Sequence, residues 1–405
     1  MANPYRELLT TPGVGGLVIA SSVARLPQAM IGIGIITMLV QQSGHYWLAG
    51  AVAGIFTLAN ALMGPQVSKL VDRLGQNRVL PWVTAFSITM LLALITAAHM
   101  RAPVPLVPLL CILAMLAGTM PSMPAMIRAR WTQLFRGKPQ LHTAFSLDTV
   151  LTELTFVIGP PLSIGLSTGI AAEAGPLAAI VLLVIGVTAF LLQRQTAPKV
   201  IKNTTEHRGS TLRIPGLGTI VLALLAMGVI GGSIDVAVVA FANAQGWPTA
   251  ASLILAAYAL GSMVAGLAFG AIRVSLPIER QFFIGVLLTA ATSVLPLLSA
   301  DVYILMATIF VAGMSFAPTM VVVMNLGTIL VPPSRLTEGL TWMTTGISIG
   351  VALGAALAGL VIDAYGARAG FGIAIAAGVV MTIIVLLGRR TLHAASMPQG
   401  GATCS

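Results

Sequence analysis

The chain has 405 residues, of which 57% are hydrophobic and only 8% are charged, and its formal net charge is +10. Its mean hydropathy is +0.97. A soluble globular protein carries about 25% charged residues, so this composition excludes a soluble protein and indicates a membrane protein. The apolar runs last about 20 residues, long enough to cross ~30 Å of hydrocarbon as helices, and the alternating pattern of a β-barrel is absent from the sequence.

The apolar runs predict about twelve transmembrane helices. The first six are expected near Gly15–Gln41, Trp47–Val67, Val79–His99, Val104–Ile127, Thr143–Gly169 and Gly175–Leu192. The last six are expected near Gly216–Asn243, Ala250–Ile272, Ile278–Ser299, Val302–Leu326, Leu336–Ile362 and Phe371–Gly388. The polar stretch between these sets predicts an N-terminal six-helix bundle over 1–192, a cytoplasmic linker over 193–215, a C-terminal bundle over 216–390 and a cytoplasmic tail over 391–405.

The basic residues predict the orientation of these helices. All but three of the 21 Lys and Arg residues fall on the side that holds both termini and the linker, the exceptions being Arg25, Arg101 and Arg368. Because short cytoplasmic loops carry the excess of Lys and Arg, that side is expected to be the cytoplasm. We therefore expect a multi-pass protein of a bacterial inner membrane, whose positive charge reflects topology and not a nucleic-acid partner.

The two halves of the chain show signs of an internal repeat. At an offset of 200 residues Trp47 corresponds to Trp247, at the outer ends of two spans, and Arg73 corresponds to Arg273 at the inner ends. Repeats of six spans are typical of secondary transporters, which bind substrate between the halves.

The loop after the second span carries a recognisable motif. It reads Ser68-Lys-Leu-Val-Asp72-Arg73-Leu-Gly75-Gln-Asn-Arg78. This resembles the signature Gly-x-x-x-Asp-Arg-x-Gly-x-x-Arg of the major facilitator superfamily, with Ser68 in place of the first Gly. The resemblance covers nearly the whole chain and implies an all-α fold of twelve helices in two pseudo-symmetric six-helix bundles, working by alternating access.

The resemblance also implies a cytoplasmic latch. In the family the Asp of this loop contacts the start of the eleventh helix, which here lies near Arg335 and Glu338. Arg73 or Arg78 would complete the latch, and a helix N-terminus favours the negative charge of Asp72. The alternative is a solvated loop that only helps to fix topology.

The stretch "FVIGPPL" at Phe156–Leu162 is similar to an element of drug/proton antiporters, although most of their additional glycines are missing. Proton-coupled efflux of a drug-like or metabolic compound is therefore favoured. Nutrient uptake by symport and a membrane sensor without flux are the alternatives.

Arg25, Asp148, Glu153 and Asp235 are ionisable residues inside predicted spans. Arg25 and Glu153 sit at similar depths in the first and fifth spans, and an unpaired charge there costs about 2.5–3.5 kcal/mol, so an Arg25–Glu153 ion pair is expected, either as a switch or as a static packing contact. Asp148 is expected either to join this pair or to face water. Asp235 in the seventh span has no basic residue at its depth, which makes it a candidate for proton coupling or cation recognition. The alternative for Asp235 is a hydrogen bond to Ser233 or to backbone, or exposure to an outer vestibule.

Other residues are candidates for the walls of a cavity or for hinges. Gly350, Gly354 and Gly359 mark one side of the eleventh span and are expected to let helices approach closely. Pro124 and Pro318 follow Gly118 and Gly313 at similar places in spans four and ten, where paired interruptions can mark hinges. The candidate cavity residues, each of which could instead pack or face lipid, are Gln28, Met30, Met115, Met123, Asn325 and Trp342.

Several chemistries find no support in the sequence. Nothing fits the Gly-x-x-x-x-Gly-Lys-Ser/Thr phosphate loop, and neither Cys111 nor Cys404 belongs to a cluster of metal ligands. We therefore expect no enzyme activity, no cofactor and no metal. The expected partners are the lipid bilayer, a small-molecule substrate and protons, and the chain is expected to function as a monomer.

Overall fold

The computed structural model describes residues 4–99, 107–135, 140–193, 196, 214, 216–271, 275–331 and 336–396. The described residues form helices and no strands, as expected where a bilayer offers no water to satisfy backbone polar groups. In the first half these are α1 (Pro4–Thr10), α2 (Val14–Ser43), α3 (Tyr46–Leu74), α4 (Gln76–His99), α5 (Val107–Ala117), α6 (Met123–Phe135), α7 (Gln140–Gly169) and α8 (Ala174–Leu192). In the second half they are α9 (Leu217–Ala244), α10 (Ala250–Ala271), α11 (Ile278–Thr292), η4 (Leu295–Leu298), α12 (Val302–Leu330), α13 (Leu336–Tyr365), η6 (Ala367–Ala369) and α14 (Gly370–Ser396).

The lengths and compositions of these helices confirm eleven of the twelve predicted membrane spans. Eleven helices of the described ranges are long and apolar enough to cross a membrane, and α5 is a shorter apolar helix at the place of the predicted fourth span. The fold is therefore the polytopic all-α fold that the sequence predicts.

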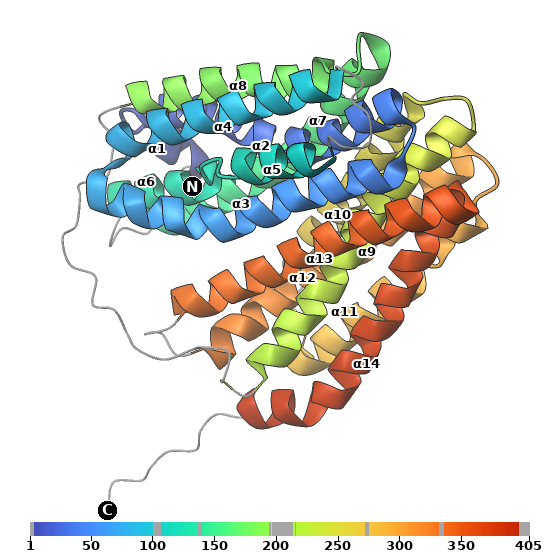
Figure 1. The fold of residues 1–405 in the computed structure, drawn as a ribbon. Helices are drawn as coiled ribbons and strands as arrows, with labels where there is room; N and C mark the ends of the chain where they lie inside the picture. The colour runs from blue at the N-terminus through green and yellow to red at the C-terminus, as the bar shows by residue number, and fades with distance from the viewer. Residues whose placement is uncertain are drawn as a thin grey trace, which may run out of the picture. The chain divides into compact units, whose positions relative to one another are not determined.

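The chain divides into two compact units (Figure 1). Unit 1 comprises Met1–Thr205 and Ala242–Ala256, and unit 2 comprises Glu206–Phe241 and Ala257–Ser405.

The helix α2 is the central element of unit 1. It packs against α3, α7 and α8, and most of its side chains are buried. Small residues permit this packing: a Cβ atom on Gly186 of α8 would collide with the backbone of Ala24, and one on Gly159 of α7 would lie 2.8 Å from the Cβ of Ala29. The polar side chains of α2 and α7 are therefore held close together inside the unit.

The fourth span is not the single helix over Val104–Ile127 that the sequence predicts. It ends as α5 at Ala117 and resumes as α6 at Met123. Neighbouring helices satisfy the carbonyl groups that the break leaves free, since Asn60 donates to the carbonyls of Gly118 and Met120 and Ser87 donates to that of Ala117. The corresponding helix α12 runs unbroken through Pro318. The interruption thus occurs in only one of the two helices.

Glycines bring α9 and α13 together in unit 2. A Cβ atom on Gly350 would collide with the carbonyl of Leu225, and one on Gly354 would collide with that of Val229. Gly228 and Gly232 of α9 approach the backbone of α13 in the same way. This confirms the close helix contact predicted for Gly350 and Gly354.

Candidate functional site

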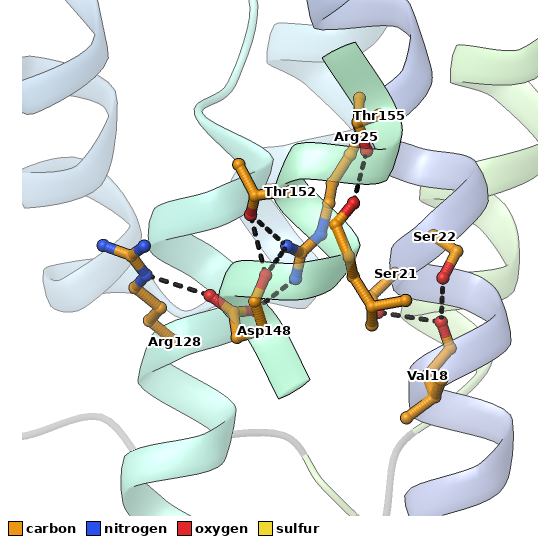
Figure 2. Close-up of polar contacts among 9 residues, drawn as sticks. Val18, Ser21, Ser22, Arg25, Arg128, Asp148, Thr152 and Thr155 are labelled. Atoms are coloured by element: carbon orange, nitrogen blue, oxygen red, sulfur yellow. Dashed lines mark hydrogen bonds and ion pairs between the residues drawn. The ribbon is translucent and has the colours of Figure 1, made fainter. Parts of the chain in front are cut away.

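An ion pair joins the two central helices of unit 1. Figure 2 shows Arg25 of α2 directed at Asp148 of α7, where one terminal guanidinium nitrogen binds the Oδ1 atom. The other terminal nitrogen donates to the backbone carbonyl of Asp148 at 3.0 Å and to the hydroxyl of Thr152 at 2.7 Å. Both charged side chains are only 1% exposed. The pair therefore satisfies most of the hydrogen-bonding capacity of a charge that would be costly if left alone.

A second arginine shares the same carboxylate. Arg128 of α6 donates from Nε to the Oδ2 atom of Asp148 at 3.0 Å, on the side opposite Arg25 (Figure 2). Its side chain is 57% exposed, in contrast to that of Arg25. Asp148 thus links a sealed guanidinium to one that reaches the surface of the unit, while the hydroxyl of Thr152 donates to the Asp148 carbonyl at 2.8 Å.

The expected partner of Arg25 was Glu153. The side chain of Glu153 lies outside the described residues, so the Arg25–Glu153 pair stays a prediction. Of the two possibilities considered for Asp148, the structure supports membership of the Arg25 network and not contact with water, because Asp148 is fully buried.

Asp235 lies in α9 and is partly buried within unit 2. Among the described residues it has no ion pair and no hydrogen bond. The hydroxyl of Ser233, one of the alternatives considered for it, donates instead to the carbonyl of Ile230 at 2.9 Å. The hydroxyl group of Tyr258 in α10 lies close enough to the Asp235 carboxyl for an electrostatic interaction. Asp235 is therefore a carboxyl group in a spanning helix without the cationic partners that Asp148 has.

The signature loop is described in part. Gly75 ends α3 with φ of +89°, a conformation that side chains other than glycine rarely adopt, and its N–H binds the carbonyl of Val71 at 2.7 Å. Arg73 and Arg78 are exposed. The side chains of Asp72 and Glu338, and all of Arg335, lie outside the described residues, so the predicted latch stays a prediction.

The candidate cavity residues differ in exposure. Met30 and Met123 are buried within unit 1, whereas Gln28, Met115, Asn325 and Trp342 are exposed in their units. Exposure of a side chain does not distinguish a cavity wall from a lipid-facing surface in a membrane protein, so their role stays a prediction.

A second buried arginine was missed by the sequence reasoning. Arg130 of α6 is 0% exposed, and its guanidinium group lies 3.6 Å from the ring centroid of Phe190. It donates to Gln76 Oε1, to the Gln193 carbonyl and to Thr196 Oγ1, each at 2.9 Å. Burial lowers the pKa of Arg130 to about 10, so the group still carries its charge at neutral pH.

The spacing within "IRARW" held a signal for this difference. Arg128 and Arg130 are two residues apart, which places them about 200° apart around a helix. One of them was therefore bound to point away from the other, and the structure buries Arg130 while Arg128 reaches the surface.

A third polar cluster lies where α2 and α4 end and α8 begins. Glu173 accepts a hydrogen bond from Gln42 at 2.6 Å and contacts His99 Nδ1 at 2.8 Å through the same oxygen, Oε1. The hydrogen bond with His99 is the main cause that lowers the pKa of the Glu173 carboxyl. Across the described residues no group of three or more His, Cys, Asp or Glu side chains is arranged to hold a metal ion.

The chain matches a family model of transporters in sequence and solved transporter structures in fold. The family model of the Major Facilitator Superfamily matches residues 17–294 and 244–402. No curated protein sequence matches the chain closely enough to inform its function.

Three solved structures show the likeness of fold. One is the peptide transporter POT in complex with sulfate, which is 12% identical, with 98% of this chain and 99% of that chain covered and a TM-score of 0.73. Another is a bacterial homologue of the human lysosomal transporter Spinster in an inward-facing and occupied conformation, which is 15% identical, with 99% and 100% covered and a TM-score of 0.69. A bacterial homologue of the iron transporter ferroportin in the inward-facing state is 16% identical, with 92% and 98% covered and a TM-score of 0.70.

At these identities the likeness concerns the fold alone. The family match extends over most of the residues, and it agrees with the loop motif Asp72–Arg78 and with the many helices long enough to span a membrane. The protein is a multi-pass membrane transporter, and the chain belongs to the major facilitator superfamily.

Proposed function

We propose that the protein is a secondary active transporter that moves a small organic solute by alternating access, and that it exports a drug-like or metabolic compound in exchange for protons. The observation that carries the proposal is Asp235, a carboxyl group in a spanning helix without an ion pair or hydrogen bond among the described residues. A carboxyl in hydrocarbon without a cationic partner is less costly when it carries a proton. Asp235 is therefore the group proposed to bind and release the coupled proton.

The surroundings of Asp148 favour a different role for that residue. Its two oxygens each bind an arginine, so a proton on Asp148 would leave Arg25 sealed in the protein without a counter-charge. The cost of an unpaired buried charge makes this step much less favourable than protonation of Asp235. We assign the Arg25–Asp148–Arg128 cluster to holding α2, α6 and α7 together during the cycle.

The distribution of basic residues supports an orientation for this cycle. We propose that both termini lie in the cytoplasm of a bacterium and that the helices cross its inner membrane, since Lys69, Arg73 and Arg78 gather at one end of α3 and α4. Asp235 is nine residues from the outer end of α9 at Ala244, about 14 Å at 1.5 Å per residue, and about 27 Å from Leu217 at the other end. An outside proton would then reach Asp235 over the shorter distance.

The test has two stages. Cells that overproduce the chain are screened against a panel of toxic compounds, and the accumulation of each compound that they resist is measured. Everted vesicles acidified inside are then given such a compound, and the loss of the pH gradient is followed with a fluorescent dye. Resistance with lowered accumulation supports export, whereas better growth on a nutrient would indicate symport in its place.

The Asp235→Asn variant tests the proton site itself. It is expected to abolish compound-dependent proton movement, while the matched variant Asp363→Asn, which alters an exposed carboxyl at the end of α13, keeps it. Unchanged proton movement in Asp235→Asn across neutral pH would overturn the assignment of Asp235.

A further inference from the structure

Arg130 is a buried cation that the proposed transport cycle does not use. It lies in α6, and its partners among the described residues are a side-chain amide, a hydroxyl, a backbone carbonyl and an aromatic ring, none of them a carboxylate. A buried charge that binds only neutral groups costs free energy, and the guanidinium recovers part of that cost through directed hydrogen bonds. The positions of these partners show which segments of the chain Arg130 connects.

The first partner belongs to the signature loop. Gln76 follows Gly75 directly and is the first residue of α4. Its side chain is buried, and it binds α6 twice, since Oε1 accepts from Arg130 Nε at 2.9 Å and Nε2 donates to the carbonyl of Met126 at 3.2 Å. The loop between α3 and α4 is thereby fastened to α6.

The other partners lie where the chain leaves α8. Gln193 follows the last residue of that helix, and Thr196 lies three residues further along. One nitrogen of Arg130 donates to both, and the hydroxyl of Thr196 in turn donates to the Gln193 carbonyl at 3.0 Å. Phe190, in the last turn of α8, packs under the same guanidinium group.

We propose that Arg130 is a positioning residue that couples the signature loop to the segment leading out of α8. Both segments bind the one rigid, planar guanidinium group of Arg130. Gln76 accepts from its Nε atom, and Gln193 and Thr196 accept from one of its terminal nitrogens. A displacement of Thr196 shifts the guanidinium and loosens the hydrogen bond to Gln76, and the reverse holds equally. The loop that identifies the family is thus linked to the start of the connection between the two halves, independently of proton coupling at Asp235.

Hydrogen exchange of the full-length protein in lipid nanodiscs tests this coupling. The reporters are the amides of Arg78 and Val79, which bind the Gly75 carbonyl, and the amide of Thr196, which binds the Gln193 carbonyl. Thr196→Val is expected to raise exchange at the distant Arg78 and Val79 amides by roughly three- to tenfold, the size of effect expected for the loss of one typical intramolecular hydrogen bond. Thr196→Ser keeps the hydroxyl and is expected to exchange like the wild type.

A double-mutant cycle separates coupling from independent local effects. The double variant carries both Gln76→Leu and Thr196→Val. Its exchange at the reporter amides is expected to rise by less than the product of the factors for the two single variants, because each single change already loosens Arg130. Arg130→Lys keeps the charge but loses the planar guanidinium group, and it is expected to raise exchange at all three reporter amides. Thr188→Val, an exposed change on α8, serves as the matched control.

Three results would overturn the proposal. One is a rise at Thr196 alone in the Thr196→Val variant, with Arg78 and Val79 unchanged. Another is a Thr196→Ser variant that behaves like Thr196→Val. The third is a rise that extends equally to the amides of α5, which would show general loosening of the unit in place of a link through Arg130.

Discussion

Arg25 and Arg128 bind opposite oxygens of one carboxylate, that of Asp148, and they differ sharply in exposure. Arg25 is sealed between α2 and α7, whereas more than half of the Arg128 side chain is exposed. The two ion pairs therefore have different dielectric surroundings and should respond differently to mutation.

We predict that Asp148→Asn destabilises the protein strongly. The change leaves the buried guanidinium of Arg25 without a counter-charge, and breaking a buried pair by removing one partner costs about 3–5 kcal/mol. The measurement is the free energy of unfolding of the purified protein in detergent, compared with Arg128→Gln. That second variant removes only the exposed partner and is expected to cost about 1 kcal/mol or less. Equal effects of the two variants would contradict the distinction drawn between them.

Asp235→Asn is predicted to leave stability unchanged or slightly raised. Asp235 has no ion pair or hydrogen bond among the described residues, so the variant breaks no such contact and replaces a group that is costly to bury when charged. Thermal unfolding of the variant beside Asp148→Asn would show the contrast. A large loss of stability in Asp235→Asn would mean that Asp235 has a structural partner and would weaken its assignment as the proton site.

The sequence allowed prediction of depth along a helix but not of direction around it. The rise per residue placed Glu153 level with Arg25 and Asp148 five residues nearer the cytoplasm, and on that ground Glu153 was predicted as the partner. Depth carries no information on which of these two side chains, about 140° apart around the helix, faces α2. Arg25 binds both the carboxylate of Asp148 and the hydroxyl of Thr152, so these two residues, four apart, share the face of α7 turned toward α2.

The sequence marked Gly118 and Pro124 as a hinge candidate in the fourth span, but it did not predict that the helix is interrupted there. Hydropathy averages over Gly118–Ser122, and the groups that satisfy the interrupted backbone, Asn60 and Ser87, come from α3 and α4. The fold, by contrast, followed from features repeated along the chain, namely the long apolar runs and the loop motif that includes Gly75.

Gly350→Ala is predicted to destabilise unit 2. The added Cβ atom would collide with the carbonyl of Leu225 in α9, and inserting a methyl group into a close-packed contact costs about 1–3 kcal/mol. Gly231→Ala in α9 is the matched control, because a Cβ atom there meets nothing within 4 Å, and its higher helix propensity is worth up to about 1 kcal/mol. Unfolding of both variants in the same detergent checks the prediction, and a Gly350→Ala protein as stable as Gly231→Ala would contradict the close packing of α9 on α13.

The contact between His99 and Glu173 predicts a loss of stability in acid. The hydrogen bond with His99 holds the pKa of Glu173 below its ordinary value of 4.5. A carboxyl with a lowered folded-state pKa binds fewer protons when folded, so its contribution is complete above the ordinary value and is lost as the pH falls through the lowered one. Because His99 is 76% exposed, solvent screens the contact and the effect on the unfolding midpoint is expected to be small.

Glu173→Gln should remove the part of the acid dependence that appears below about pH 4.5, and His99→Ala should remove most of the same part. If His99→Ala keeps the wild-type acid dependence while Glu173→Gln loses it, the hydrogen bonds from backbone and from Gln42, and not that with His99, stabilise the Glu173 carboxylate.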